Sequence, residues 1–223
     1  MNRFRTILAT ALALAALAGG ASTILADDDG VQRYAVTVTN LTRGQILSPP
    51  LVIAHDSHFK LFTPGEAASA ELAALAEDAD ASGMMALLGT LPQVFDFELG
   101  GGPVLPGEFV TVEIETRGRY RDITVAGMLV TTNDAFFAGS TSMLPRGRSA
   151  SLTAIAYDAG SEGNTESCEH IPGPPCNHPM VPATEAAEGF VHVHAGVHGG
   201  GDLAAAEFDW RNPTAYVTVR RAD

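Results

Sequence analysis

Short alternations of apolar and polar residues run through the chain from residue 34 onward. Tyr34–Asn40 (Tyr-Ala-Val-Thr-Val-Thr-Asn) alternates and is rich in β-branched residues, which is typical of a strand with one buried face. Seven similar runs follow: Pro50–His55, Val94–Leu99, Phe109–Thr116, Ile123–Thr131, Leu152–Tyr157, Phe190–His194 and Ala215–Arg220. About eight short strands separated by glycine, proline and asparagine predict an all-β fold, an antiparallel β-sandwich or barrel, of which we favour the sandwich.

One segment departs from this pattern. Residues 65–90 are rich in alanine, and Leu72, Leu75 and Ala76 stand at helical spacing. We expect a helical insertion at about 66–89, made of helices at about 66–78 and 82–89, with Ser82 capping the second. Because no repeat and no long linker divides the rest, residues 27–223 are expected to form a single domain.

The beginning of the chain has the pattern of a secretory signal. Arg3 and Arg5 precede an apolar run from Ile7 to about Ala18, and small residues continue to Ala26. We expect a signal peptide at residues 1–26. Cleavage after residue 21 and an uncleaved anchor are the alternatives. Since no later stretch approaches the roughly 20 apolar residues of a membrane helix, the mature protein is expected to be secreted, periplasmic or on the cell surface, without direct membrane insertion.

Charge and cysteine content narrow the class of protein. The chain has a formal net charge of −13, and removal of residues 1–26 leaves 11 basic and 26 acidic residues. This charge repels nucleic acid and anionic lipid unless a multivalent cation intervenes. Cys168 and Cys176 flank a proline-rich segment, which predicts a disulfide in an oxidising compartment. A zinc site is less favoured because no further cysteine completes a thiolate set.

The segment 156–170 is the first candidate for a metal site. Its oxygen-bearing side chains stand at near-alternate positions: Asp158, Glu162, Asn164 and Glu166. Gly160 and Gly163 between them allow the backbone to curl around a small ion. Calcium takes six to eight oxygen ligands in flexible geometry, so this pattern favours Ca²⁺, with a solvated acidic turn as the alternative.

Several short motifs resemble the spondin amino-terminal domain, in its bacterial exported form. They are Tyr-Ala-Val-Thr-Val-Thr-Asn-Leu-Thr at 34–42, Gln-Ile-Leu-Ser-Pro-Pro at 45–50, His-Asp at 55–56, Thr-Thr-Asn-Asp-Ala-Phe at 131–136, Tyr-Asp-Ala-Gly-Ser-Glu at 157–162 and Trp-Arg-Asn-Pro at 210–213. The resemblance implies a noncatalytic β-sandwich that holds one calcium ion. In animals such domains open matrix proteins such as F-spondin and mindin and serve adhesion, so a protein or glycan partner is expected.

The resemblance also implies specific metal ligands. The family's ligands correspond to Glu115, Asp134 and Asp158, and Glu113 is an alternative because strand alternation places it on the same face as Glu115. Asp134 and Asp158 follow predicted strands, where loops carry function. Carboxylates that converge in this way repel each other unless a divalent ion lies between them. With Glu162 from the acidic loop, these residues form the expected calcium site.

Histidines provide a competing site. His192 and His194 share one face of a predicted strand, and His198 follows in a glycine-rich turn. With His170 or His178, they predict a zinc or copper site as the alternative to calcium. Hydrogen-bonded histidines on an exposed strand are the structural explanation of the same pattern.

The sequence gives little support to catalysis. His55, Asp56 and His58 lie together, but no Gly-x-Ser-x-Gly motif provides a nucleophile. We therefore predict a protein that is not an enzyme, in which His55 and Asp56 fix a turn through backbone hydrogen bonds. Trp210, the single tryptophan, is expected to fill part of the core.

Overall fold

The computed structural model describes residues 30–142, 144, 149–177 and 181–222. The predicted signal peptide at 1–26 and His178 lie outside these residues. Within them, no helix has the length and apolar character that crossing a membrane requires.

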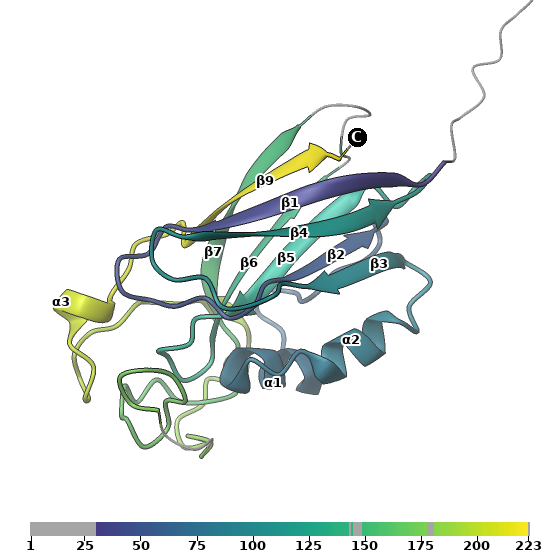
Figure 1. Cartoon of the computed structure of the whole chain (residues 1–223). Helices are drawn as coiled ribbons and strands as arrows, with labels where there is room; N and C mark the ends of the chain where they lie inside the picture. The colour runs from purple at the N-terminus through teal and green to yellow at the C-terminus, as the bar shows by residue number, and fades with distance from the viewer. Residues whose placement is uncertain (1–29, 143, 145–148, 178–180, 223) are drawn as a thin grey trace, which may run out of the picture.

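The all-β prediction is confirmed: antiparallel strands form a nearly closed, barrel-like sandwich with a few short helices (Figure 1). The strands are β1 (Gln32–Asn40), β2 (Leu51–His55), β3 (Val94–Leu99), β4 (Phe109–Thr116), β5 (Asp122–Met128), β6 (Ala135–Thr141), β7 (Ala150–Asp158), β8 (His192–Val193) and β9 (Ala215–Arg221). The helices are α1 (Ala70–Asp78), α2 (Ser82–Leu88) and α3 (Ala205–Phe208).

The strand order is β3-β2-β5-β6-β7-β9-β1-β4, and β8 pairs with β7 off this path. Strand β7 joins the two layers, because residues 150–154 pair with β9 whereas residues 155–158 pair with β6. The outermost strands, β3 and β4, meet where the backbone N–H of Glu115 donates to Asp96 Oδ2 at 2.7 Å. This contact brings the curled sheet close to a closed barrel.

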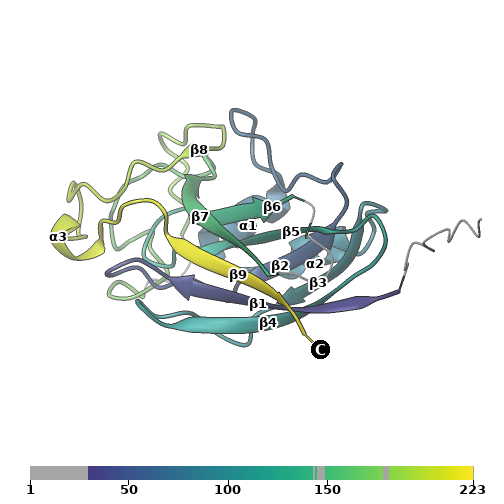
Figure 2. The same cartoon turned by 90° about the horizontal axis from the view of Figure 1, so that it is seen from above.

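Two hydrophobic cores lie on opposite faces of β2, β5 and β6. Val52 and Phe137 point into the barrel, whereas Ile53 and Phe136 point outward toward α1 and α2. The helices cover this outer face (Figures 1 and 2), with Leu72 of α1 fully buried against it. Since neighbouring residues of a strand face opposite sides, these strands are buried on both faces.

The helix boundaries differ from the prediction. Helix α1 begins after Ser69, whose hydroxyl accepts a hydrogen bond from the backbone N–H of Leu72, so it starts later than residue 66. The prediction that Ser82 caps α2 is wrong, because Ser82 is the first helical residue and the N-cap is Ala81. The backbone N–H of Ser82 instead donates to Asp80 Oδ1.

Three strands also differ from the prediction. Strand β6 was not predicted. The run Ile123–Thr131 ends as a strand at Met128, and Phe190–His194 forms only the two-residue strand β8.

The single tryptophan, Trp210, is buried in the barrel core, as predicted.

Candidate metal centre

The loops between β7 and β9 gather at one end of the sheet, away from the C-terminus and the beginning of β1 (Figure 1). At this end Asp158, the last residue of β7, pairs with Ala135, the first residue of β6. Asp134 immediately precedes β6, and its carbonyl accepts a hydrogen bond from the N–H of Ala159 at 3.1 Å. Strand pairing therefore brings the backbones of Asp134 and Asp158 side by side, and both residues are 0% exposed.

The two carboxylate oxygens of Asp134 have different surroundings. Oδ2 accepts hydrogen bonds from the backbone N–H groups of Ser161 at 2.9 Å and Glu162 at 3.0 Å. Oδ1 is buried and has no hydrogen-bond partner among the described residues. Burial, followed by the charge of Asp158, raises the pKa of Asp134 to about 7. A buried oxygen without a donor is unusual in folded proteins and calls for a bound proton or cation.

Glu162 extends this group of acids. It is buried, and its Oε2 lies 3.5 Å from Asn133 Nδ2. Burial raises the pKa of Glu162 to about 7, and its charge contributes to the raised pKa of Asp134. We call Asp134, Asp158 and Glu162 the carboxylate cluster; among the described residues, their ligand atoms do not all lie within 4.8 Å of one another.

Asp158 is held by its own loop and lies near two imidazoles. Its Oδ1 accepts the backbone N–H of Gly160 at 2.7 Å, and its Oδ2 accepts Asn164 Nδ2 at 2.6 Å. His192 Nδ1 lies 3.9 Å from Oδ1, and His194 Nε2 lies 3.8 Å from Oδ2. Gly160 has φ +69°, and a Cβ there would lie 2.4 Å from the carbonyl oxygen of residue 190, so this turn requires glycine.

His194 is not free to bind a metal. Its Nδ1 accepts the backbone N–H of Gly196 at 2.9 Å, so the proton resides on Nε2, which donates to Asn164 Oδ1 at 2.9 Å. Burial, followed by the charge of His192, lowers the pKa of His194 to about 4. His194 is therefore a neutral donor that orients Asn164.

The other predicted imidazole ligands do not gather around His192. His198 has an exposed side chain, and its backbone N–H donates to Glu166. His170 Nδ1 donates to the carbonyl of Val181 at 2.9 Å. Among the residues that the structure describes, His192, His194 and His198 do not converge as a set of ligands.

Glu166, a candidate calcium ligand in the sequence, instead binds backbone N–H groups of a neighbouring turn. Its carboxylate accepts backbone N–H groups from His198 and Gly200. Burial acts to raise the pKa of Glu166, but these donors, with those of Gly199 and Gly201, outweigh it and lower the pKa. Glu166 thus holds the glycine-rich turn at 198–201.

Glu115 does not join the carboxylate cluster. It pairs with Arg33 across β4 and β1, with an ion pair of 2.9 Å, at the end of β1 where Tyr34 pairs with Arg221. The site lies at the opposite end of the strands, so the placement of Glu115 in it is wrong. The alternative, Glu113, is exposed and pairs with Ala35 near the same distant end.

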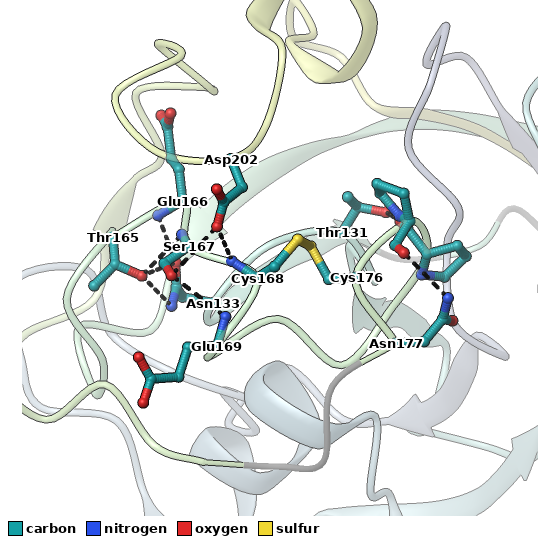
Figure 3. The surroundings of a disulfide bond; sticks show 12 residues. Thr131, Asn133, Thr165, Glu166, Ser167, Cys168, Glu169, Cys176, Asn177 and Asp202 are labelled. Carbon is teal, nitrogen blue, oxygen red and sulfur yellow. Dashed lines mark hydrogen bonds between the residues drawn. A yellow bond between two sulfur atoms is a disulfide. The ribbon is translucent and has the colours of Figure 1, made fainter.

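The disulfide Cys168–Cys176 is present, as predicted, and anchors the loop beside the cluster (Figure 3). The N–H of Cys168 donates to Asp202 Oδ2 at 2.8 Å, and Thr131 Oγ1 donates to the carbonyl of Pro174 at 2.7 Å. The loop thereby connects residues 131–133, which precede Asp134, to the turn at 198–202.

One further group of residues has the geometry of a metal site. Ligand atoms of Asp158, Glu188 and His192 lie within 4.8 Å of one another. Asn164 Nδ2 also donates to Glu188 Oε1 at 3.2 Å, so its amide bridges Glu188 and Asp158. Sequence reasoning missed Glu188, because an isolated glutamate in an irregular loop carries no periodic or motif signal.

His55 and Asp56 fix a turn, as predicted. His55 Nδ1 donates to the carbonyl of Asp56 at 2.7 Å, and Asp56 Oδ1 accepts the backbone N–H of His58 at 3.0 Å. Burial lowers the pKa of His55, which keeps its ring neutral.

Comparison with models of known protein families finds no match to this chain, and a search of curated proteins finds none either. The functional conclusion therefore rests on the geometry of the site and on the motifs of the sequence.

Proposed function

We propose that this protein is an exported calcium-binding β-domain of the spondin amino-terminal type that acts as a noncatalytic binding or adhesion module. The observation that carries the proposal is Asp134 Oδ1, a buried oxygen with no hydrogen-bond partner in the described part of the chain, in a carboxylate on which the charge of buried Asp158 also acts.

The buried carboxylate of Asp134, with one oxygen that no described donor reaches, keeps its charge only when a cation compensates it. Asp134, Asp158 and Glu162 offer only oxygen atoms, which is the chemistry that calcium prefers. Backbone N–H groups hold one oxygen of Asp134, and Gly160 and Asn164 hold the two oxygens of Asp158, so both carboxylates are fixed in place. A cation bound here would stabilise the folded state, because the cluster exists only when β6 and β7 are paired.

The exposed face of β4, β1 and β9 supports the binding role. Phe109 and Tyr216 are 68% and 41% exposed and lie on either side of Thr39 in the strand register. Two residues earlier along β1, the hydroxyl of Thr37 is hydrogen bonded to the hydroxyl of Thr111 on β4 at 2.8 Å. Exposed aromatics on a sheet whose hydroxyls are ordered suit contacts with a protein or a glycan.

The noncatalytic role is supported by the state of the groups that a hydrolase would use. His55 bonds the Asp56 carbonyl and the hydroxyl of Thr124, and the nitrogens of His194 are both engaged. His194 therefore has no free nitrogen with which to activate a nucleophile.

Asp134→Asn tests the calcium proposal. Calorimetric titration of the chelator-treated protein should give saturable calcium binding, and calcium at about ten times Kd should stabilise the fold by about 1.4 kcal/mol. The variant should lose both effects, because the amide removes a charged ligand while keeping the size of the side chain.

Asp56→Asn is the matched control, since Asp56 is a buried aspartate in a turn remote from the cluster. It should keep the calcium response of the parent protein. Absence of calcium binding by the parent, or an equal response in Asp134→Asn, would refute the proposal.

A further inference from the structure

We propose that Asp158, Glu188 and His192 form a second cation site, for a zinc-class transition metal, at the surface above the carboxylate cluster. This site goes beyond the proposed function, since it uses two residues, Glu188 and His192, that the calcium proposal does not need. Asp158 is common to both sites.

The fold places the three ligands independently of one another. His192 is directly opposite Asp158 in the pairing of β8 with β7. Glu188 is held nearby because the N–H of the next residue, Gly189, donates to the carbonyl of Gly160 at 2.8 Å. The ligand atoms of the three residues consequently lie within 4.8 Å of one another.

A chain of hydrogen bonds orients the two carboxylates. Gly196 N–H donates to His194, His194 donates to the carbonyl of the Asn164 amide, and the Asn164 NH₂ group donates to both Asp158 and Glu188. The amide orientation is determined, because His194 has its only proton on Nε2. Asn164 holds one oxygen of each carboxylate and leaves the other oxygen of Glu188 available to an ion.

The ligand types select the metal. One imidazole nitrogen with two carboxylates is a set that zinc accepts, with a water in the remaining position, whereas calcium and magnesium prefer oxygen alone. Outer hydrogen bonds of the kind that His194 and Asn164 supply commonly orient the ligands of metal sites. The site is also accessible: Glu188 is exposed and the His192 side chain is 32% exposed, whereas Asp158 is buried.

Zinc titration of the tag-free, chelator-treated protein tests this site. Calorimetry and elemental analysis after dialysis should show a single zinc ion bound at equilibrium. His192→Ala and Glu188→Gln should each weaken zinc binding by more than the roughly 10- to 100-fold typical of changes in outer hydrogen-bond partners. Glu188→Gln is nearly isosteric at an exposed position, so it keeps the test valid even if His192→Ala is unstable.

His198→Ala and Glu185→Gln are the matched controls, because both residues are exposed and lie in the same loops outside the ligand group. They should bind zinc like the parent. Glu188→Gln should retain any thermal stabilisation by calcium, and Asp134→Asn should retain zinc binding, which separates failure of this site from failure of the calcium proposal. No zinc binding by the parent, or equal loss in the control variants, would overturn the inference.

Discussion

The carboxyl group of Asp134 has one oxygen held by two backbone donors and one oxygen with no donor in the described structure. The Asp134 carboxylate and its neighbours, Asp158 and Glu162, are buried. The negative charges of Asp134 and Glu162 therefore lie in a medium that screens them poorly, and their raised pKa values show that protonation is the response available to the metal-free protein. Protons and calcium should compete for this residue, so that calcium binds more tightly as pH rises through about 7.

The stability of the metal-free protein should depend on pH through Asp134. Its pKa in the folded state is about 7, above the ordinary value of 3.8, so the folded state binds more protons than the unfolded state between these values. The free energy of unfolding should consequently fall as pH rises from about 4 to about 7, by on the order of 4 kcal/mol from this group.

Chemical denaturation in the presence of a chelator, for the parent and Asp134→Asn, measures this effect. His194, whose pKa of about 4 lies below its ordinary value, makes the opposite contribution: its stabilisation is complete above about pH 6.5 and is lost as pH falls toward 4. Because His194 is present in both proteins, the difference between them isolates Asp134. A difference that does not grow in favour of the variant between about pH 4 and 7 would contradict the assignment.

At the scale of elements, the disulfide loop links the surroundings of the carboxylate cluster to the rest of the fold. It contacts the segment before Asp134 through Thr131 and the glycine-rich turn through Asp202 (Figure 3). These contacts hold the cluster from outside the sheet, because strand pairing positions Asp134 and Asp158 but not the loop that follows.

Replacement of both cysteines by serine should lower the free energy of unfolding by about 2 to 3 kcal/mol, since the bond closes a short loop of the chain. The same variant should bind calcium more weakly, because the segment before Asp134 loses an anchor. Denaturation and calcium titration of the parent under oxidising and reducing conditions provide the comparison. Unchanged calcium affinity in the double variant would show that the sheet alone orders the cluster.

The elements that sequence patterns predicted best are those with one exposed face. The boundaries of β3 and β4 agree with the prediction. Strand β6 begins with Ala-Phe-Phe-Ala, which has no alternation because Phe136 packs under the helices while Phe137 fills the barrel. A strand buried on both faces lacks the period-2 signal, and covering by helices far away in sequence cannot be read from the strand itself.

The sequence predicted those site residues whose positions are set by the end of a paired strand. Asp134 and Asp158 follow apolar runs whose pairing brings them together. Glu115 was assigned from the family resemblance, and strand alternation could not correct it, because alternation specifies the face of a strand and not which of its ends meets the site. Glu188 was missed because only the folded loop, held by Gly189 and Asn164, brings it to Asp158.

At the scale of the whole molecule, acidic residues far outnumber basic ones, and the full chain has a net charge of −13. Among the described residues, most charged side chains are not buried and are screened by salt, whereas the carboxylate cluster is buried and is screened much less. Stabilisation by the screening of surface charges should therefore be distinguishable from stabilisation by calcium bound at the cluster.

Sodium chloride should raise the melting temperature of the chelated protein modestly and to a similar extent in Asp134→Asn, because it screens surface repulsion in both. Calcium at matched ionic strength should raise the melting temperature of the parent further, but not that of the variant. Thermal melts across the two salts measure this difference. Equal effects of calcium and sodium on the parent would indicate screening without a specific site.

The near closure of the barrel has a consequence for how the protein behaves at high concentration. Strands β3 and β4 each have a partner on one side only, and their other sides face each other, with Asp96 of β3 receiving the N–H of Glu115 in β4. Free strand edges are the usual template on which further chains add by β-pairing. Since each edge shields the other, and both carry acidic side chains, copies of this protein should resist stacking into fibrils even at high protein concentration.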